Sequence, residues 1–178
     1  MKLHLGCGYK PLKGFVNVDI RQETPCDVVD DVSKLTNFEN NSADLIYACH
    51  VLEHFGRNEY KEVLKRWADV LKSGGVLRIS VPDLQKVSEL HHTKKYPLKK
   101  LIGFLYGGQN YKENYHYIGF DFDMLKEDLE ELGFCDVKRW SWQEVEHGDV
   151  DDYSQAYLPH MDKENGELMS LNIEATKK

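Results

Sequence analysis

The chain has 178 residues, of which 41% are hydrophobic, and a formal net charge of −7 at pH 7. This size suits one hydrophobic core, so we expect residues 1–178 to form a single domain. The negative charge disfavours duplex nucleic acid as a partner, and no apolar run approaches the roughly 20 residues that a membrane-spanning helix needs.

The opening residues, MKLHLGCG, place glycines and a histidine where a signal peptide has its apolar core. The four cysteines, Cys7, Cys26, Cys49 and Cys135, lack the CxxC spacing of a zinc or redox site, and at least three lie in apolar, strand-like runs. Both features predict a cytoplasmic protein with reduced thiols.

Short β-branched and aliphatic runs alternate with helical patterns, which predicts an α/β fold. We expect strands at Lys2–Leu5, Phe15–Asp19, Asp27–Val29, Asp44–Ala48, Val76–Val81, Phe134–Trp140 and Met169–Ala175. The clearest helix spans Asn58–Leu71, where apolar residues recur every three or four positions, and Gly74 and Gly75 are expected to end it. A second helix is expected at Phe122–Leu132.

The connection between the first two predicted strands is unusually short. Only Tyr9–Gly14 separates them, whereas a parallel crossover normally takes a dozen or more residues and a helix. Six extended residues reach roughly 20 Å, about one strand length, so the chain can return without a helix, and Pro11 favours that path. We therefore expect one sheet face to lack its helices and to be apolar enough to attract a partner, such as a second copy forming a homodimer.

A glycine-rich bend ends the first predicted strand, and an acid ends the second. The bend is LHLGCG at residues 3–8, and Asp19 follows Gly8 by eleven positions. Glycines let a ligand approach the backbone, and an acid on the neighbouring strand is placed to accept hydrogen bonds from ribose hydroxyls. The segment leaves no room for the helix that holds a pyrophosphate, and Pro11 replaces the third glycine of G-x-G-x-x-G. The pattern thus favours phosphate-free S-adenosylmethionine over NAD or FAD.

The order of these landmarks resembles the class I S-adenosylmethionine-dependent methyltransferases, particularly a compact group with an LGCG loop and an NVD strand. The landmarks are LHLGCG, NVDI, DVVDDVSKL, NSADLIYACHVLEHF, LKSGGVLRISVPD, L-x-x-L-GF and SLNIEA, and they cover nearly the whole chain except residues 84–115. The resemblance implies a Rossmann-like sheet of seven strands, mostly parallel with an antiparallel C-terminal strand and with N-terminal helices reduced or absent. It also implies S-adenosyl-L-methionine as the cofactor.

The resemblance assigns the cofactor contacts to nine residues: Gly6, Cys7, Gly8, Asp19, Ile20, Asp31, Val32, Cys49 and His50. It places the glycine bend under the methionine part, Asp19 on the ribose and Ile20 on the adenine. Cys49 and His50, after the fourth strand, would face the methyl group.

Asp31 matches the family acid that pairs with the adenine amino group, and Val32 would flank the ring. In the competing interpretation Asp30 takes that role, or both acids cap the following turn. At His4 the sequence departs from the family, in which many members have an acid that steadies the glycine bend.

Methyl transfer to a hydroxyl or a protonated amine benefits from a general base. The candidates are His116, His50 and Asp83, and Asp83 follows the fifth strand at the edge where open sheets bind ligands. A surface or supporting role is the alternative for each.

The segment HVLEH permits a metal site as a second interpretation. On a helix His50, Glu53 and His54 share a face, and with His116 they resemble the E-x-x-E-H clusters of certain metal-dependent methyltransferases, although His50 replaces the first Glu. The ordinary explanation of Glu53 is a favourable charge near a helix N-terminus, and on that interpretation no metal is expected.

Residues 84–118 are rich in Tyr, Gly and Lys and are expected to form a lid over the acceptor, with Gly107 and Gly108 as a hinge. Residues 146–166 are predicted to be a long polar loop. The expected function is methyl transfer to a small polar acceptor, with a saccharide favoured by similarity to methyltransferases of polysaccharide modification. The alternatives are a non-catalytic S-adenosylmethionine-binding module and an NAD-dependent oxidoreductase.

Overall fold

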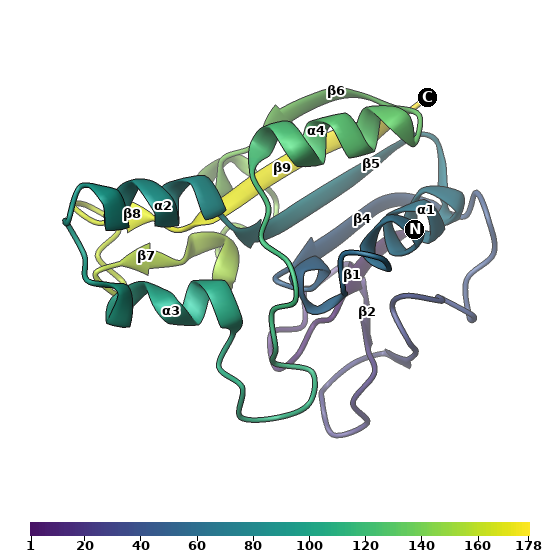
Figure 1. The fold of residues 1–178 in the computed structure, drawn as a ribbon. Helices are drawn as coiled ribbons and strands as arrows, with labels where there is room; N and C mark the ends of the chain where they lie inside the picture. The colour runs from purple at the N-terminus through teal and green to yellow at the C-terminus, as the bar shows by residue number, and fades with distance from the viewer.

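The structure, a computed structural model, describes all 178 residues and contains one seven-stranded sheet in the order β3-β2-β1-β4-β5-β9-β6 (Figure 1). The strands are β1 (Lys2–Leu5), β2 (Val16–Asp19), β3 (Val28–Val29), β4 (Ala43–Cys49), β5 (Leu71–Pro82), β6 (Phe134–Arg139) and β9 (Ser170–Lys177). Only β9 runs antiparallel, between β5 and β6. The predicted fold class is confirmed, and all seven strands lie where the sequence patterns place them, although their ends differ.

The largest difference concerns the two glycines after the first helix. Helix α1 (Tyr60–Val70) ends before them, because Leu71 is already extended, with φ −67° and ψ 141°. Gly74, with φ +76°, lies instead in a bend within β5, so the prediction that Gly74 and Gly75 end the helix is wrong. Helix α4 (Phe122–Glu131) starts at the predicted residue. Asp121 caps its N-terminus, because the Asp121 side chain accepts a hydrogen bond from the Met124 amide.

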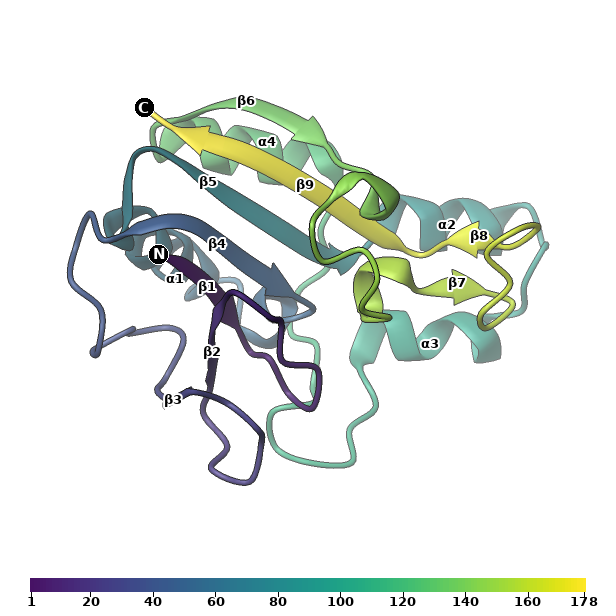
Figure 2. The same ribbon diagram turned by 180° about the vertical axis from the view of Figure 1, so that it is seen from behind.

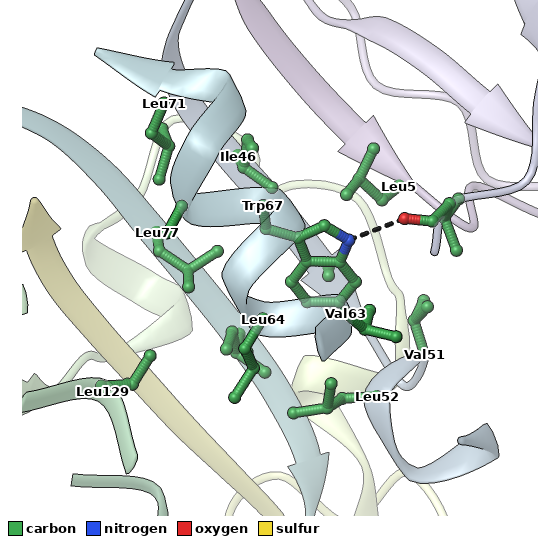
Figure 3. Close-up of a cluster of buried hydrophobic side chains, with 14 of the residues drawn as sticks. Leu5, Ile46, Val51, Leu52, Val63, Leu64, Trp67, Leu71, Leu77 and Leu129 are labelled. Carbon is green, nitrogen blue, oxygen red and sulfur yellow. Dashed lines mark hydrogen bonds between the residues drawn. The ribbon is translucent and has the colours of Figure 1, made fainter. Parts of the chain in front are cut away.

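Helices α1 and α4 cover one face of the sheet, where the main core lies (Figure 1). The apolar stripe of α1 brings Trp67 to the centre of this core, with leucines, isoleucine and valines around it (Figure 3). Its indole N–H donates to the Val32 carbonyl over 2.8 Å, which satisfies the one polar group of a fully buried side chain. This bond ties the chain after β3 to α1.

The opposite face carries no α-helix between the early strands, as the short connections predict (Figure 2). The expectation of an exposed apolar face there is wrong. Tyr47 is fully buried, and Leu12, Phe15, Leu45 and Cys49 are buried with it. The cover comes from the 8–15 loop and from residues 140–155, which include the short 3-10 helices η2 (Trp142–Glu144) and η3 (Tyr153–Gln155). Because this face is covered, it does not offer the apolar surface from which a homodimer was predicted.

Residues 84–118 contain two helices that the sequence patterns did not predict, α2 (Leu84–His92) and α3 (Leu98–Tyr106). They pack together beyond the carboxyl end of β5, beside the small β7–β8 hairpin (Tyr157–Leu158 and Glu167–Leu168) (Figure 1). Apart from this hairpin and η3, the predicted 146–166 loop is irregular. None of the helices is long and apolar enough to cross a membrane.

Candidate active site

The carboxyl ends of β1, β2, β4 and β5 lie along one edge of the sheet, because these strands are parallel. Most of the candidate site residues follow these strands directly. The segment after α3 runs past the same edge before it reaches α4 (Figure 1). Two backbone bonds fix it there: the Tyr117 amide donates to the Glu53 carbonyl over 2.9 Å, and the Leu84 amide donates to the Phe120 carbonyl over the same distance.

The glycine bend after β1 contacts the acid at the end of β2, as the sequence spacing predicts. The Gly8 amide donates to Asp19 Oδ2 over 2.8 Å, and the Asp19 side chain is buried. Gly6 and Gly8 have φ values of +65° and +52°, which other residues rarely adopt. A Cβ at Gly8 would meet only the tip of Arg21, at 3.4 Å, so the bend leaves room for a ligand.

Arg21 is a site residue that the sequence analysis missed. Its Nε donates to Asp19 Oδ1 over 3.2 Å, and its backbone amide donates to the same oxygen over 2.9 Å. The guanidinium lies 5.3 Å from the ring centre of Tyr111 and 5.7 Å from that of Tyr9. No motif marks this position: its bonds to Asp19 are local, but its contact with Tyr111 depends on a loop 90 residues away in the chain.

The residues expected around an adenine differ in their exposure and in their hydrogen bonds. Asp30 is buried, and both its oxygens accept hydrogen bonds, from the Thr36 hydroxyl and the Asn37 amide. Asp31 is partly exposed; burial raises its pKa, but bonds from Ser33 and Lys34 outweigh this and lower it. Ile20 is exposed, so its apolar side chain is accessible to a flat ligand. Both oxygens of Asp31 have partners too, Ser33 and Lys34, so it is the greater exposure of Asp31 that favours it over Asp30.

Val32 and Cys7 are less accessible than expected. The Val32 side chain packs in the main core, so only its backbone and edge border this region. Cys7 is buried within the bend, and desolvation raises the pKa of its thiol to about 12.

Cys49 and His4 point away from the edge. Cys49 packs in the second-face cluster with Tyr47, so the expectation that its side chain faces the methyl group is wrong. His4 is buried on the same face, with Nδ1 3.1 Å from Asn17 Oδ1 and its ring stacked on Tyr47. A histidine thus occupies the family's acid position, and it bonds to Asn17 instead of steadying the bend by charge.

Glu53 is the centre of a histidine cluster after β4. It lies in the short 3-10 helix η1 (Leu52–His54), is fully buried, and neither of its oxygens has a hydrogen-bond partner. Its Oε1 is 3.2 Å from His50 Nδ1 and 3.9 Å from His116 Nε2. Burial by itself raises the pKa of Glu53, but the three surrounding imidazoles, those of His50, His54 and His116, outweigh burial and lower it.

The three candidate bases differ in their bonding. His116 Nδ1 lies 3.0 Å from the Phe104 carbonyl, and desolvation lowers the pKa of the ring. His50 Nε2 lies 2.8 Å from Ser170 Oγ, so both of its ring nitrogens face protein groups. Asp83 caps α2 by accepting from the Lys86 amide and pairs with Arg139 at 3.5 Å, which is a structural role. His50 Nδ1 and His116 Nε2 both lie near Glu53 without a hydrogen bond to it, and of the two histidines only His116 also lines a cavity, described next.

A cavity of about 190 Å³ borders His116, and its lining includes Tyr106, Tyr117, Ile118 and Leu84. It lies between the start of α2 and the segment after α3, next to the ends of β4 and β5. A larger hollow of about 550 Å³ lies at the turn between α2 and α3, but none of its lining residues is a candidate site residue. The smaller cavity is therefore the relevant one.

Comparison with known proteins agrees with this geometry. Residues 3–79 match the family model described as a methyltransferase domain. No relative of curated function matches the sequence.

Solved structures share the fold over almost the whole chain. A methyltransferase from Archaeoglobus fulgidus is 18% identical with a TM-score of 0.61, covering 99% of this chain and 85% of its own. A Thermotoga maritima methyltransferase is 14% identical with a TM-score of 0.61, covering 99% and 82%. The 1,6-didemethyltoxoflavin-N1-methyltransferase of Burkholderia thailandensis, solved with its substrate and S-adenosylhomocysteine, is 17% identical with a TM-score of 0.58, covering 99% and 70%.

The family match contains the glycine bend, Asp19 and the strands around them, and the fold of the whole chain is the methyltransferase fold. On these two findings, residues 3–79 resemble a methyltransferase domain, and the whole chain has the fold of S-adenosylmethionine-dependent methyltransferases.

Proposed function

We propose that the bend of Gly6, Cys7 and Gly8 and the carboxylate of Asp19 hold the methionine and ribose parts of S-adenosylmethionine. The observation that carries this proposal is the 2.8 Å bond from the Gly8 amide to Asp19 Oδ2, which joins the open bend to a buried acid. Each oxygen of a carboxylate can accept two hydrogen bonds, so Oδ2 retains capacity for a ribose hydroxyl.

The adenine would then lie over exposed Ile20, with Asp31 as acceptor of its amino group and the Val32 backbone at its edge. His50 follows β4 and would border the methyl group. Cys49 would contribute backbone only, because its side chain is turned to the other face.

The acceptor would bind in the cavity beside His116. A volume of about 190 Å³ is below the roughly 300–1,000 Å³ of most ligand pockets, which suits a small polar group or one end of a longer molecule. Exposed tyrosines line or flank this region, and their rings can stack on a sugar. We therefore propose a small polar acceptor with a hydroxyl, of which a saccharide is one.

Residues 84–118 would act as the lid of this site. Tyr111 contacts Arg21 beside the donor position, and His116 lies at the acceptor cavity, so one segment borders both ligands. Gly107 has its own reason to be glycine, because a Cβ there would meet the Asn114 carbonyl at 2.5 Å. The Gln109 amide donates to the same Asn114 carbonyl over 2.8 Å, and this bond closes a compact loop that would move as a unit.

The chemistry is a displacement at carbon. S-adenosylmethionine supplies a methyl group on a cationic sulfur: the acceptor oxygen attacks the methyl carbon, the carbon–sulfur bond breaks with its electron pair going to sulfur, and S-adenosylhomocysteine leaves. The chain aligns the two ligands and excludes water, effects that together can supply on the order of 7–11 kcal/mol. The proton of the acceptor hydroxyl would leave at the Glu53–His116 cluster, because His116 lines the cavity and its Nε2 lies 3.9 Å from Glu53 Oε1.

The donor site is tested by calorimetric titration with S-adenosylhomocysteine. We expect Asp19→Asn to weaken binding about tenfold to a hundredfold, because a hydrogen bond to a charged group contributes about 1.5–3 kcal/mol. Asp136→Asn, at an exposed carboxylate on β6, is the matched control and should bind as the parent does. Equal affinity of the Asp19→Asn variant and the parent, or tight binding of NAD, would contradict the proposed donor site.

A further inference from the structure

Helix α3 presents an apolar stripe to solvent. The stripe consists of Leu98, Ile102 and Tyr106, which are spaced four apart and have exposed fractions of 46%, 46% and 54%. The buried side of the same helix is Leu101, which packs against α2, so the stripe is not the side that holds α3 in the fold. In both views α3 lies at the lower margin of the molecule, and no other element lies beyond it (Figure 1 and Figure 2). An exposed apolar stripe of this kind indicates a surface that binds a partner.

The stripe lies within a basic segment of an otherwise acidic chain. Residues 91–112 contain five lysines and no Asp or Glu, although the whole chain has a net charge of −7. In this segment only Lys95 forms an ion pair, with Glu167. The other lysines are exposed and unpaired: Lys94, Lys99, Lys100 and Lys112. Their charges are therefore free to attract an anionic partner.

The hollow of about 550 Å³ at the turn between α2 and α3 continues this basic surface. Its lining consists of His91, His92, Lys94, Tyr96 and Pro97. Pro97 directly precedes Leu98, so the hollow borders the first residue of the stripe. The lysine and the histidines offer N–H donors, and no carboxylate lines the hollow. Such a lining suits an anionic group, such as the phosphate of a lipid headgroup.

We propose that α3 binds the surface of an anionic lipid bilayer, with the stripe among the acyl chains and the lysines at the headgroups. A helix that presents apolar residues beside lysines is typical of segments that lie in the interfacial plane of a membrane, and such a helix does not have to span it. The exposed Tyr111, Tyr115 and Tyr117 follow α3, and tyrosine rings favour the headgroup level. A second copy of the chain is the poorer occupant, because a symmetric contact through the stripe would bring two basic segments together.

The bilayer would then lie next to the acceptor cavity. Tyr106 ends the stripe and also lines that cavity, together with Leu105 and His116. A cavity of about 190 Å³ holds one end of a longer molecule, so the acceptor would be the polar headgroup of a lipid whose tail stays in the bilayer. This identification of the acceptor rests on the proposed function. Binding of α3 to a bilayer needs neither donor nor acceptor, so its failure would leave the titration with S-adenosylhomocysteine unaffected.

The test is sedimentation of the protein with lipid vesicles. We expect the parent to bind vesicles made of equal parts of phosphatidylcholine and phosphatidylglycerol, to bind phosphatidylcholine alone at least about tenfold more weakly, and to be released as sodium chloride is raised to about 0.5 M. The double variants Leu98→Gln, Ile102→Gln and Lys99→Gln, Lys100→Gln should each weaken binding to the mixed vesicles about tenfold or more. All four side chains are exposed, so both variants should fold, which circular dichroism checks.

The matched control is the double variant Lys126→Gln, Lys138→Gln, which removes the same charge from α4 and β6. It should bind the mixed vesicles as the parent does. The proposal is overturned if the parent does not bind these vesicles, if the folded α3 variants bind them equally well, or if the control loses as much affinity as they do. A parent that ignores vesicles but self-associates in analytical ultracentrifugation, with the association lost in the stripe variant, would also overturn it, because the stripe would then be the interface of a homodimer.

Discussion

Arg21 binds Oδ1 of Asp19, one of the two carboxylate oxygens that the ribose of the donor could use. Its guanidinium donates to Asp19 Oδ1 and lies between the rings of Tyr9 and Tyr111. A bound ribose would have to compete with this ion pair, and partly exposed pairs of this kind contribute about 0.2–1 kcal/mol. The pair therefore sets a small cost on donor binding and links it to the loop that carries Tyr111.

Replacing Arg21 by Ala should tighten S-adenosylhomocysteine binding by up to about fivefold, since the competing pair is lost. Arg57→Ala, at an exposed position beside η1, is the control and should leave the affinity unchanged. Calorimetry measures both. If Arg21→Ala instead weakens binding, the guanidinium is part of the ribose site and does not compete with the ribose.

Residues 140–155 cover the second face of the sheet, where the early strands have no helices. They are anchored by the Tyr47 hydroxyl, which donates to Asp152 Oδ2 over 2.7 Å, while Asp152 Oδ1 caps η3 through the Ser154 amide. Tyr47 is fully buried, and this burial raises the pKa of its hydroxyl well above 10, so it remains a donor. Tyr47 thus holds this cover together with three other strand residues, Arg78, Ser170 and Asn172.

Tyr47→Phe should lower the free energy of unfolding by about 1.5–3 kcal/mol and speed amide hydrogen exchange in residues 150–156. Tyr60→Phe is the matched control, because its hydroxyl donates to buried Asp128 over 2.8 Å on the opposite face. The control should lose comparable stability without faster exchange in residues 150–156. Unchanged exchange in Tyr47→Phe would mean that other contacts hold the segment.

For the whole molecule, the sequence predicts what local patterns and chain order encode. The stripe of α1 and the spacing from Gly8 to Asp19 depend on near neighbours, and both lie where expected. Helix α3 was missed because only Leu101 on it is buried, against α2 and Met169, so its apolar side is defined by tertiary contacts.

The candidate site shows the same limit. The backbone positions after each strand follow from the parallel sheet, and Cys49 shares a face with Leu45 and Tyr47 because alternate residues of β4 point the same way. What covers that face depends on segments far away in the chain. The ring orientations of His116 and His54 depend on the carbonyls of residues 104 and 115, and the spacing within HVLEH does not encode these contacts.

Stability at mild acidity depends on the second face as well, through His4. Burial lowers the pKa of His4 to about 4, and Asn17, Asp152 and Asp19 offset burial only in part, while His147 adds to it. In the unfolded chain the pKa returns to about 6.5, so between these values the unfolded state binds more protons. The free energy of unfolding therefore falls as the pH is lowered from about 6.5 towards about 4.

Between about pH 7.5 and about pH 5, His4 alone should remove about 2 kcal/mol from the free energy of unfolding, measured by urea denaturation at the two values. The pKa of His147 is also lowered, mainly by its burial, so it acts in the same direction. Groups common to both proteins cancel when the parent is compared with His4→Gln, which keeps a donor for Asn17 but cannot titrate. The variant should lose less stability over the same interval, by about that 2 kcal/mol. An equal loss in both proteins would mean that His4 is protonated in the folded state or that the acid sensitivity arises elsewhere, and the covered face would then not be the dry environment described here.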